Sequence, residues 1–552
     1  MSHNTKIRVL MLASAWFVLG IVVTNAAALE SAEIADWSGR LTLAVESAQV
    51  STTVLRDDVG VSQNPLLKWD TLPDLSLAFV HSGEFLIPLS SGAIPSDHPN
   101  WEWVITSGQV EQINSGARIS IPVALMEKNE NCLHNGVLTT TLTPEKPMSM
   151  AQLEFASETC QYFKFDLSAS VKMHWQTEPK NTTRAKRYRA EFDRERATTI
   201  PIKPIQDLLT KYPMLDNEGI AESTTIAPKH MSHYGVIIED AHYASGCNTR
   251  AGQYRHCDQM AMPSYSWAKS VVASFALMRL ESLYPGTSQQ KISNYVPQCT
   301  GAAWRDVRFI DALNMQTGNY ESQAMSADEA SPGYQPFFLA TTHAEKITFA
   351  CEYFSRKSKP GTEFVYHTSD TYILGTAMAA FWKEQKGDAS DFFKDLIIND
   401  IFTPLGLSAT AKWIRRSNDE AAQPFTGWGL ILNRNDIAKL LSFLSGTNPY
   451  LSPQSVFNHT DLNIALAGLS QGSTNTSSVL AYRRGFWAYN LQHKTACSTP
   501  VWIPFMSGYG GLSAAIVSPQ MAYYNVSDGG QHAFANALVE LNKITPLCGK
   551  DD

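Results

Sequence analysis

The sequence is poor in charge, and basic residues are not in excess. Asp, Glu, Lys and Arg make up 17% of its 552 residues, and 44 basic against 52 acidic residues give a net charge of −8. Proteins that bind nucleic acids favour a basic face, so this balance argues against a nucleic-acid partner. Internal repeats and low-complexity tracts are also lacking. With 44% hydrophobic residues the chain can bury a large core, which excludes a disordered protein.

Cysteine spacings typical of metal sites are lacking as well. None of the 8 cysteines forms C-x-x-C, and none has a histidine at zinc-ligand spacing, which argues against a metal site. An even number of cysteines instead suits disulfides in an oxidising compartment. Many connectivities are open, and the simplest pairs neighbours in chain order: Cys132 with Cys160, Cys247 with Cys257, Cys299 with Cys351, and Cys497 with Cys548.

Long hydrophobic runs are confined to the N-terminus. Lys6 and Arg8 precede an apolar run over residues 9–23, and the small residues 26–28 follow it. This layout predicts a secretory signal peptide over residues 1–28. The run is shorter than the ~20 residues that span a bilayer, which favours cleavage over a retained anchor. We therefore expect a periplasmic or secreted protein with no membrane span after signal cleavage.

The length predicts two domains, because one hydrophobic core usually supports no more than about 250–300 residues. Residues 29–178 carry short stretches of alternating polarity, such as EFLIPL and ARISIPVAL, between clusters of Gly, Pro, Asn and Asp. This pattern predicts an N-terminal all-β, sandwich-like domain. Trp101 and Trp103 are interpreted as buried strand residues in preference to a polymer-binding surface. We find no catalytic motif in this part.

Charge and hydrophobic period both change further along the chain. Residues 179–229 are rich in charge, which indicates a solvated linker with an exposed helix. Residues 230–552 have the mixed pattern of an α/β domain. Apolar residues at spacings of three and four predict an amphipathic helix up to Leu283. Further helices are expected at 305–316, 370–385, 390–402, 433–446 and 531–543, with strands at 234–247, 502–511 and 521–529.

The sharpest chemical signal is the S-x-x-K sequence formed by Ser266 and Lys269 at the start of the helix that ends at Leu283. Residues three apart share a helical face, so the lysine amine lies beside the serine hydroxyl. A lysine whose pKa is lowered by desolvation can remove the serine proton and make the oxygen a nucleophile. The plainer interpretation, a helix-capping serine and a surface lysine, stays open on this motif alone.

Two further features suit the same chemistry. Tyr366 precedes a predicted helix, and a buried tyrosine near a lysine can relay a proton. The stretch Ser507–Leu512 is rich in glycine, and glycines let a backbone N–H come close to a substrate. Each feature also has a structural interpretation, as core packing for the tyrosine and as an ordinary strand entry for the glycines.

Taken together, the motifs of residues 230–548 resemble the serine β-lactamase and penicillin-binding superfamily. They are most similar to its branch of class C β-lactamase-like esterases, D-aminopeptidases and 6-aminohexanoate-oligomer hydrolases. Six segments occur in the order of that branch: SYSWAKSVVASFA, WRDVRFIDALNMQTGNYES, KPGTEFVYHTSDTYILG, IFTPLGLSAT, GWGLILNRNDIAKLLSFL and YRRGFWAYN. The first 200 residues are outside this resemblance.

The resemblance implies Ser266 as nucleophile, Lys269 as its general base and Tyr366 as a proton relay. It places Tyr509, Gly510 and Gly511 at the K-T-G position and implies that the backbone N–H groups of Ser266 and Leu512 form the oxyanion hole. Two departures bear on the substrate. Thr368 stands where the Y-x-N motif has its asparagine, which weakens the case for β-lactam recognition. Tyr509 replaces the lysine that binds a carboxylate, so an anionic substrate is disfavoured.

These observations predict an antiparallel sheet flanked by helices, with a helical lobe that contributes Tyr366. Asp370 is interpreted as a helix cap in preference to a catalytic group. The expected reaction is hydrolysis of a small-molecule ester or amide through an acyl-enzyme on Ser266, with no cofactor. The alternatives are a D,D-peptidase or β-lactamase, and a non-catalytic binding protein that keeps the fold. The sequence leaves the oligomeric state open.

Overall fold

The computed structural model describes residues 36–43, 50–128, 131–143, 146–466 and 477–548. The predicted signal peptide lies outside these residues. From Trp37 onward the chain forms one compact unit. Among the described residues, no helix combines the length and the apolar character needed to cross a bilayer.

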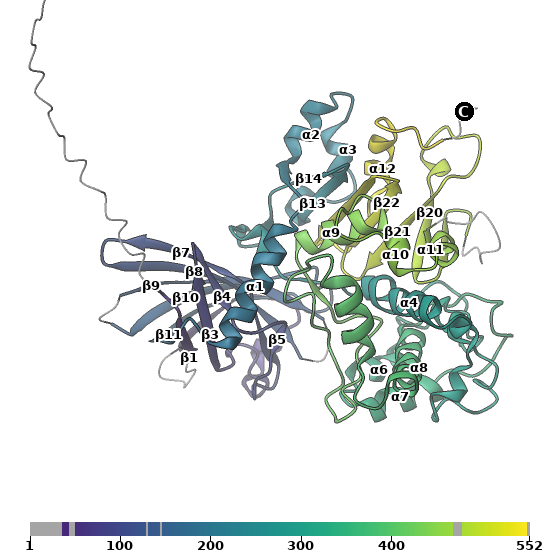
Figure 1. Cartoon of the computed structure of the whole chain (residues 1–552), viewed down its shortest axis with the longest axis horizontal. Coiled ribbons are helices and arrows are strands. Elements are labelled where there is room, and N and C mark those ends of the chain that lie inside the picture. Colours follow the sequence, from purple (N-terminus) through teal and green to yellow (C-terminus); the bar gives the residue numbers. More distant parts are fainter. Residues whose placement is uncertain (1–35, 44–49, 129–130, 144–145, 467–476, 549–552) are drawn as a thin grey trace, which may run out of the picture. The chain divides into compact units, whose positions relative to one another are not determined.

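The N-terminal part of this unit is one antiparallel sheet of 11 strands (Figure 1). Its pairings run β8–β7–β4–β3–β1–β11–β10–β9 and return from β9 to β8, so the sheet closes on itself. The strands are β1 (Gly39–Leu43), β2 (Val50–Asp57), β3 (Leu75–Ser82), β4 (Phe85–Pro88), β5 (Ala93–Ile94), β6 (Trp101–Ile105), β7 (Gly108–Ile113), β8 (Gly116–Glu127), β9 (Leu133–Leu142), β10 (Met148–Glu158) and β11 (Phe165–Thr177).

The closed sheet differs from the sandwich-like arrangement that the sequence suggested. Both arrangements bury every second side chain of a strand, so the alternation cannot tell them apart. Long β8 makes the closure possible, because β9 pairs along its whole length while β7 and β6 share its other edge. Trp101 and Trp103 lie in the core enclosed by this sheet, fully buried as predicted.

The stretch 179–229, predicted as a linker with an exposed helix, contains that helix and further regular elements. Helix α1 (Thr183–Ala197) packs Tyr188 and Phe192 against the outside of the closed sheet. Strand β12 (Ile202–Pro204) then pairs in parallel with β14, which belongs to the second sheet. The helices α2 (Ile205–Lys211) and α3 (Asn217–Ile220) follow. The domain boundaries themselves stay a prediction.

The second sheet has 8 strands in the order β12-β14-β13-β23-β22-β21-β20-β19. All of its pairings except β12–β14 are antiparallel, and they bring together strands from both ends of the region after residue 200. Its remaining strands are β13 (Met231–Ile238), β14 (Ala241–Ala244), β19 (Leu480–Arg483), β20 (Phe486–Asn490), β21 (Trp502–Gly508), β22 (Leu512–Ser518) and β23 (Met521–Ser527).

Helices cover both faces of this sheet. Successive residues of a strand point to opposite sides, so they pack against different helices. On β22, Ala515 and Val517 pack with α2, α3 and α12 (Ala535–Asn542). The alternate residues Ala514 and Ile516 face the larger core, which holds α4 (Phe275–Leu283), α8 (Thr368–Lys386) and α9 (Arg434–Leu444). The mixed fold with a helix-flanked antiparallel sheet is therefore as predicted.

The predicted helices are present with altered bounds. The helix expected at 305–316 is only α5 (Phe309–Leu313), and the helix expected at 390–402 is a wide π-helical segment over Phe393–Phe402. Two helices that the sequence did not predict, α6 (Gln335–Leu339) and α7 (His343–Glu352), lie beside α8 in the helical region (Figure 1).

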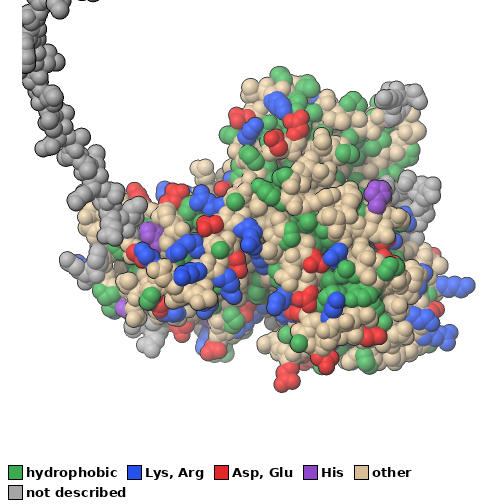
Figure 2. All heavy atoms as spheres, viewed as in Figure 1, with side chains coloured by type: hydrophobic (Ala, Val, Ile, Leu, Met, Phe, Trp, Pro, Cys, Tyr) green, Lys and Arg blue, Asp and Glu red, His purple; other side chains and the backbone are tan. Residues whose placement is uncertain are grey.

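The predicted disulfides are confirmed. The structure pairs the cysteines in chain order: Cys132–Cys160, Cys247–Cys257, Cys299–Cys351 and Cys497–Cys548. On the face drawn in Figure 2, Lys and Arg are intermingled with Asp and Glu, in keeping with the modest net charge.

A buried ion cluster joins the closed sheet to the second sheet. Asp528 directly follows β23 and is 2% exposed. Its carboxylate accepts the backbone N–H of Thr159 at 3.0 Å and pairs with Arg250 and Lys164. Arg250 also holds Asp166 of β11 at 2.8 Å. Because all of these charges have partners, their burial is tolerated, and removing one leaves the others uncompensated.

We predict that Asp528→Ala lowers the free energy of unfolding by about 3 kcal/mol, because it removes the carboxylate that pairs with Arg250 and Lys164 and accepts the N–H of Thr159. Urea denaturation followed by tryptophan fluorescence measures this. The matched control is Asp58→Ala, which removes the half-exposed Arg56–Asp58 pair and should cost less than about 1 kcal/mol. Equal losses in the two variants would contradict a structural role for the cluster.

Candidate active site

Ser266 lies on a tight turn between a short strand and a helix. Strand β17 (Met262–Pro263) pairs with β18 (Ile431–Leu432) and fixes the chain just before the serine. Tyr265 then has a φ of 41°, in the left-handed region that a non-glycine residue rarely adopts. After Ser266 the chain enters a π-helical segment over Lys269–Ser274, which continues into α4. The serine is thereby held, partly exposed, at the start of a buried helix.

Lys269 is buried beside the serine, as the S-x-x-K spacing predicts. Its side chain is 2% exposed, and Nζ donates to Ser266 Oγ at 2.9 Å. Nζ also donates to the backbone oxygen of Gly427 at 3.2 Å and to Thr368 Oγ1 at 2.9 Å. Burial lowers the pKa of Lys269 from 10.5 to about 8, and the Glu329 carboxylate opposes this shift. The amine can therefore lose its proton near neutral pH and act as a base.

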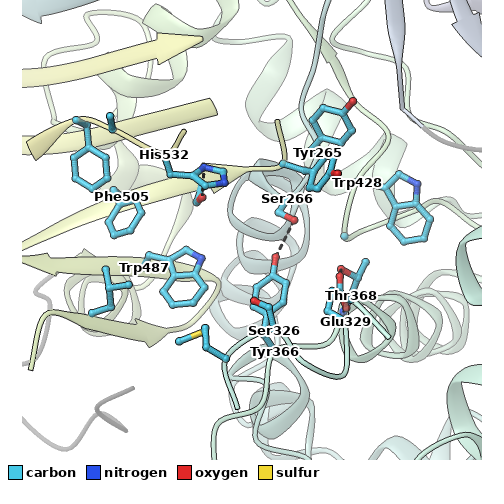
Figure 3. A pocket seen from close by; sticks show the side chains of 18 of the residues that line it. Tyr265, Ser266, Ser326, Glu329, Tyr366, Thr368, Trp428, Trp487, Phe505 and His532 are labelled. Carbon is cyan, nitrogen blue, oxygen red and sulfur yellow. Dashed lines mark hydrogen bonds between the residues drawn. The ribbon is translucent and has the colours of Figure 1, made fainter. Parts of the chain in front are cut away.

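Tyr366 also contacts the serine (Figure 3). Its hydroxyl donates to Ser266 Oγ at 2.8 Å, and Lys269 Nζ lies 5.0 Å from its ring centroid. Trp487 stacks on the ring with centroids 5.8 Å apart. Burial, followed by the charge of Glu329, raises the pKa of the phenol above its usual value of 10. The hydroxyl therefore keeps its proton and is a donor.

Thr368 links the lysine to an acid that the sequence did not reveal. Its Oγ1 accepts from Lys269 Nζ and donates to Glu329 Oε1, while its backbone N–H donates to Glu329 Oε2 at 2.9 Å. The threonine that replaces the expected asparagine is thus a relay in a chain of polar contacts. Glu329 belongs to no recognisable motif, so no sequence signal could have identified it.

The serine opens on a cavity of about 1080 Å³. Ser266, Glu329, Tyr366 and Thr368 line it, and aromatic side chains form much of the remaining wall. In Figure 3, Trp487, Phe505 and His532 lie on one side of the serine, and Trp428 lies on the other with Thr368 and Glu329. Glu222 and Lys494 are the other charged residues among the described lining, which includes no arginine.

The glycine-rich stretch does not meet the serine as expected. Tyr509 lines the cavity and is 48% exposed, but Gly510, Gly511 and Leu512 do not line it. The two glycines have φ values of 87° and 116° and form the turn between β21 and β22. A Cβ on Gly510 would lie 1.8 Å from the carbonyl oxygen of Thr159, so its close approach is to the closed sheet. Leu512 is fully buried, paired with Gly508.

The part of the hairpin that comes close to the serine is the end of β21, before the glycine turn. Ser507 lines the cavity, and its hydroxyl lies 3.3 Å from His532 Nδ1. A Cβ on Gly508 would meet the carbonyl oxygen of Ser264 at 3.0 Å, so β21 passes close to the turn that carries Ser266. Strand β20 pairs with β21 only as far as Phe505, which leaves this end of β21 uncovered by β20.

Asp370 is not the helix cap that the sequence suggested. His367 occupies the N-cap of α8 and makes no side-chain cap hydrogen bond. Asp370 lies in the first turn, 3% exposed, and accepts from Thr317 Oγ1 at 3.3 Å. Burial raises its pKa to about 7, with the His367 ring opposing the shift. It makes no hydrogen bond to Ser266 or Lys269 among those of the described residues.

No protein-family model matches the sequence, and no curated protein matches it either. Solved structures are similar in fold. A Bacillus anthracis protein assigned as a 6-aminohexanoate-dimer hydrolase is 12% identical over 62% of this chain and 81% of its own, with a TM-score of 0.41. A class C β-lactamase is 14% identical over 68% and 99%, with a TM-score of 0.40. EstCE1, a hydrolase with promiscuous acyltransferase activity, is 13% identical over 64% and 98%, also with a TM-score of 0.40.

Proposed function

We propose that the protein is an exported serine hydrolase that cleaves esters or amides through an acyl-enzyme on Ser266. The observation that carries this proposal is the pair of hydrogen bonds to Ser266 Oγ, at 2.9 Å from Lys269 Nζ and at 2.8 Å from the Tyr366 hydroxyl. A base and a proton donor therefore contact one hydroxyl that faces a large cavity. A purely structural serine needs neither partner.

The two partners divide the proton transfers. Neutral Lys269 takes the hydroxyl proton as Ser266 Oγ bonds to the acyl carbon. Tyr366, which keeps its proton, donates it to the leaving alcohol or amine and is reprotonated from the Lys269 ammonium. Water then attacks the acyl-enzyme, with the same groups removing its proton and returning one to Ser266 Oγ. The acid is released and the site regains its starting protonation.

Backbone N–H groups stabilise the oxyanion in this scheme. In this proposal the N–H of Ser266 is one donor. We assign the second donor to Ser507 on β21 in place of Leu512, because Ser507 lines the cavity and Leu512 is buried.

The cavity favours a neutral, bulky substrate with apolar or aromatic groups. Its volume slightly exceeds the range for drug-sized ligands, about 300–1,000 Å³, so it accommodates more than a small amide. Met325 and Leu339 line the cavity yet are 51% and 56% exposed, which extends the apolar wall to the surface. Glu329 near the serine disfavours an anion, and Lys269, the nearest cation, is held by three acceptors.

Four disulfides suit the periplasmic or extracellular location proposed here.

A fluorophosphonate probe tests the nucleophile and its base. We expect the wild-type protein to be labelled and Ser266→Ala to remain unlabelled. Lys269→Ala should slow labelling by about 10²–10⁴-fold, because it removes the amine that hydrogen-bonds to Ser266 Oγ and acts as the base in this scheme. Lys383→Ala, which removes an exposed lysine of α8, is the matched control and should label at the wild-type rate. Normal labelling of Lys269→Ala would remove the lysine from the mechanism.

The pH dependence of acylation should follow Lys269. Its neutral form is the base, so the rate rises with pH and levels off above the pKa of about 8. Glu329→Gln removes a charge that stabilises the ammonium, so its inflection should move to lower pH. Stopped-flow acylation with a p-nitrophenyl ester between pH 5.5 and 10 measures both profiles. Glu222→Gln changes another acid of the same cavity and should leave the inflection in place. A shifted inflection in Glu222→Gln together with an unshifted one in Glu329→Gln would contradict the assignment of the inflection to Lys269.

Substrate charge should affect the rate through Glu329. We expect kcat/KM for p-nitrophenyl butyrate to exceed that for the p-nitrophenyl hemiester of succinate by about tenfold or more, since the carboxylate repels the anion. In Glu329→Gln the difference should narrow, as measured by initial rates at low ionic strength. Equal rates for the two esters in the wild-type protein, or a preference for the anion, would contradict a neutral substrate.

A further inference from the structure

Asn131 brings the closed sheet into the candidate active site. It lies just before β9, beside the disulfide-bonded Cys132, and is 1% exposed. Its Oδ1 accepts the backbone N–H of Tyr265 at 3.1 Å and that of Gly429 at 3.2 Å. Its Nδ2 reaches the carbonyl oxygen of Leu430 at 3.5 Å. One buried side chain thus bonds to two backbone segments that are far apart in sequence.

Both segments carry groups that the proposed reaction uses. Tyr265, with its φ of 41°, immediately precedes the nucleophile Ser266. The segment that contains Gly429 also contains Gly427, whose carbonyl oxygen accepts from Lys269 Nζ. A Cβ on Gly427 would lie 2.8 Å from the side chain of Thr368, so only glycine lets that carbonyl approach the lysine. Asn131 therefore links the backbone segment that carries the nucleophile Ser266 to the segment whose carbonyl oxygen binds the base Lys269.

The closed sheet makes further contacts outside the turn that carries Ser266. Asn135 of β9 is 3% exposed and makes two hydrogen bonds to the backbone of Ala261, at 2.7 and 3.0 Å. Tyr162 lines the cavity, and its ring lies 6.2 Å from that of Tyr509. The Tyr162 hydroxyl donates to Glu127 of β8 at 2.9 Å. The wall of the cavity is thus partly built from the N-terminal sheet.

We propose that the N-terminal closed sheet is part of the active site, with Asn131 as a positioning residue for Ser266 and Lys269. This inference rests on the proposed hydrolase function. A left-handed Tyr265 is strained, and its backbone N–H requires a buried acceptor in that conformation. Asn131 Oδ1 supplies the acceptor, so losing it lets the turn relax and moves Ser266 Oγ away from its base. A displacement of about 1 Å at a reacting atom can cost about 10²-fold in rate.

The test compares two asparagines of the same interface. Asn131→Ala should lower kcat for a p-nitrophenyl ester by about 10–100-fold and change KM by less than about threefold. Asn135→Ala removes the two hydrogen bonds to Ala261 without touching the Ser266 turn, and kcat should fall by less than about threefold. Asn131→Asp keeps the oxygen acceptor and should recover most of the lost rate. Equal losses in the two alanine variants, or an unchanged kcat in Asn131→Ala, would overturn the proposal.

Hydrogen–deuterium exchange tests the positioning without relying on activity. In Asn131→Ala, the peptides that contain Tyr265 and Gly429 should exchange faster, because their N–H groups lose their acceptor. In Asn135→Ala, the faster exchange should centre on Ala261. Unchanged protection at Tyr265 and Gly429 would overturn the role of Asn131. Failure of the wild-type protein to label at Ser266 would instead refute the hydrolase function, and the two failures are thus distinguishable.

Discussion

The burial of one lysine amine is the constraint on which the rest of the site depends. A charged amine away from water is costly, and the protein offsets that cost with three acceptors around Lys269 Nζ. These acceptors come from three segments, at Ser266, Thr368 and Gly427, so the amine fixes their mutual positions. Desolvation at the same time lowers the pKa of Lys269 to about 8, which makes it usable as a base.

The surrounding fold can be understood as support for these three segments. The turn at Ser266 is held between β17 and the buried helix, and Thr368 begins α8 two residues after Tyr366. Gly427 lies shortly before β18, the partner strand of β17. Each segment is anchored in regular structure, which limits the freedom of the reacting groups. Pre-organisation of this kind lowers a barrier because the geometry is in place before substrate binds.

The sequence predicted the parts of the site that depend on local spacing. Ser266 and Lys269 are three residues apart at the start of one helix, and Tyr366 lies two residues before α8, a helix that its own sequence indicates. Glu329 was missed because its contact with Thr368 depends on how a loop folds back, and no spacing records that. Asn131 was missed for a related reason, since its partners are more than a hundred residues away.

In the fold, too, local features were predictable and contacts between distant residues were not. Alternating polarity predicted the strands of residues 29–178 but not the closure of their sheet, because closure depends on pairing between β8 and β9 and not on any one strand. Leu512 shows that the sequence also left the exact position of a turn undetermined. The glycine-rich stretch was placed on the right hairpin, but the turn falls at Gly510 and Gly511, so the cavity is reached from β21 and not from β22.

The most direct measurement is mass mapping of the covalent intermediate. The protein is mixed with an ester that deacylates slowly, quenched in acid during turnover and digested, and the acylated peptide is sequenced by mass spectrometry. We predict the added acyl mass on Ser266, with none in the Ser266→Ala protein. Turnover that proceeds without an acyl adduct, or with the adduct on another residue, would contradict it.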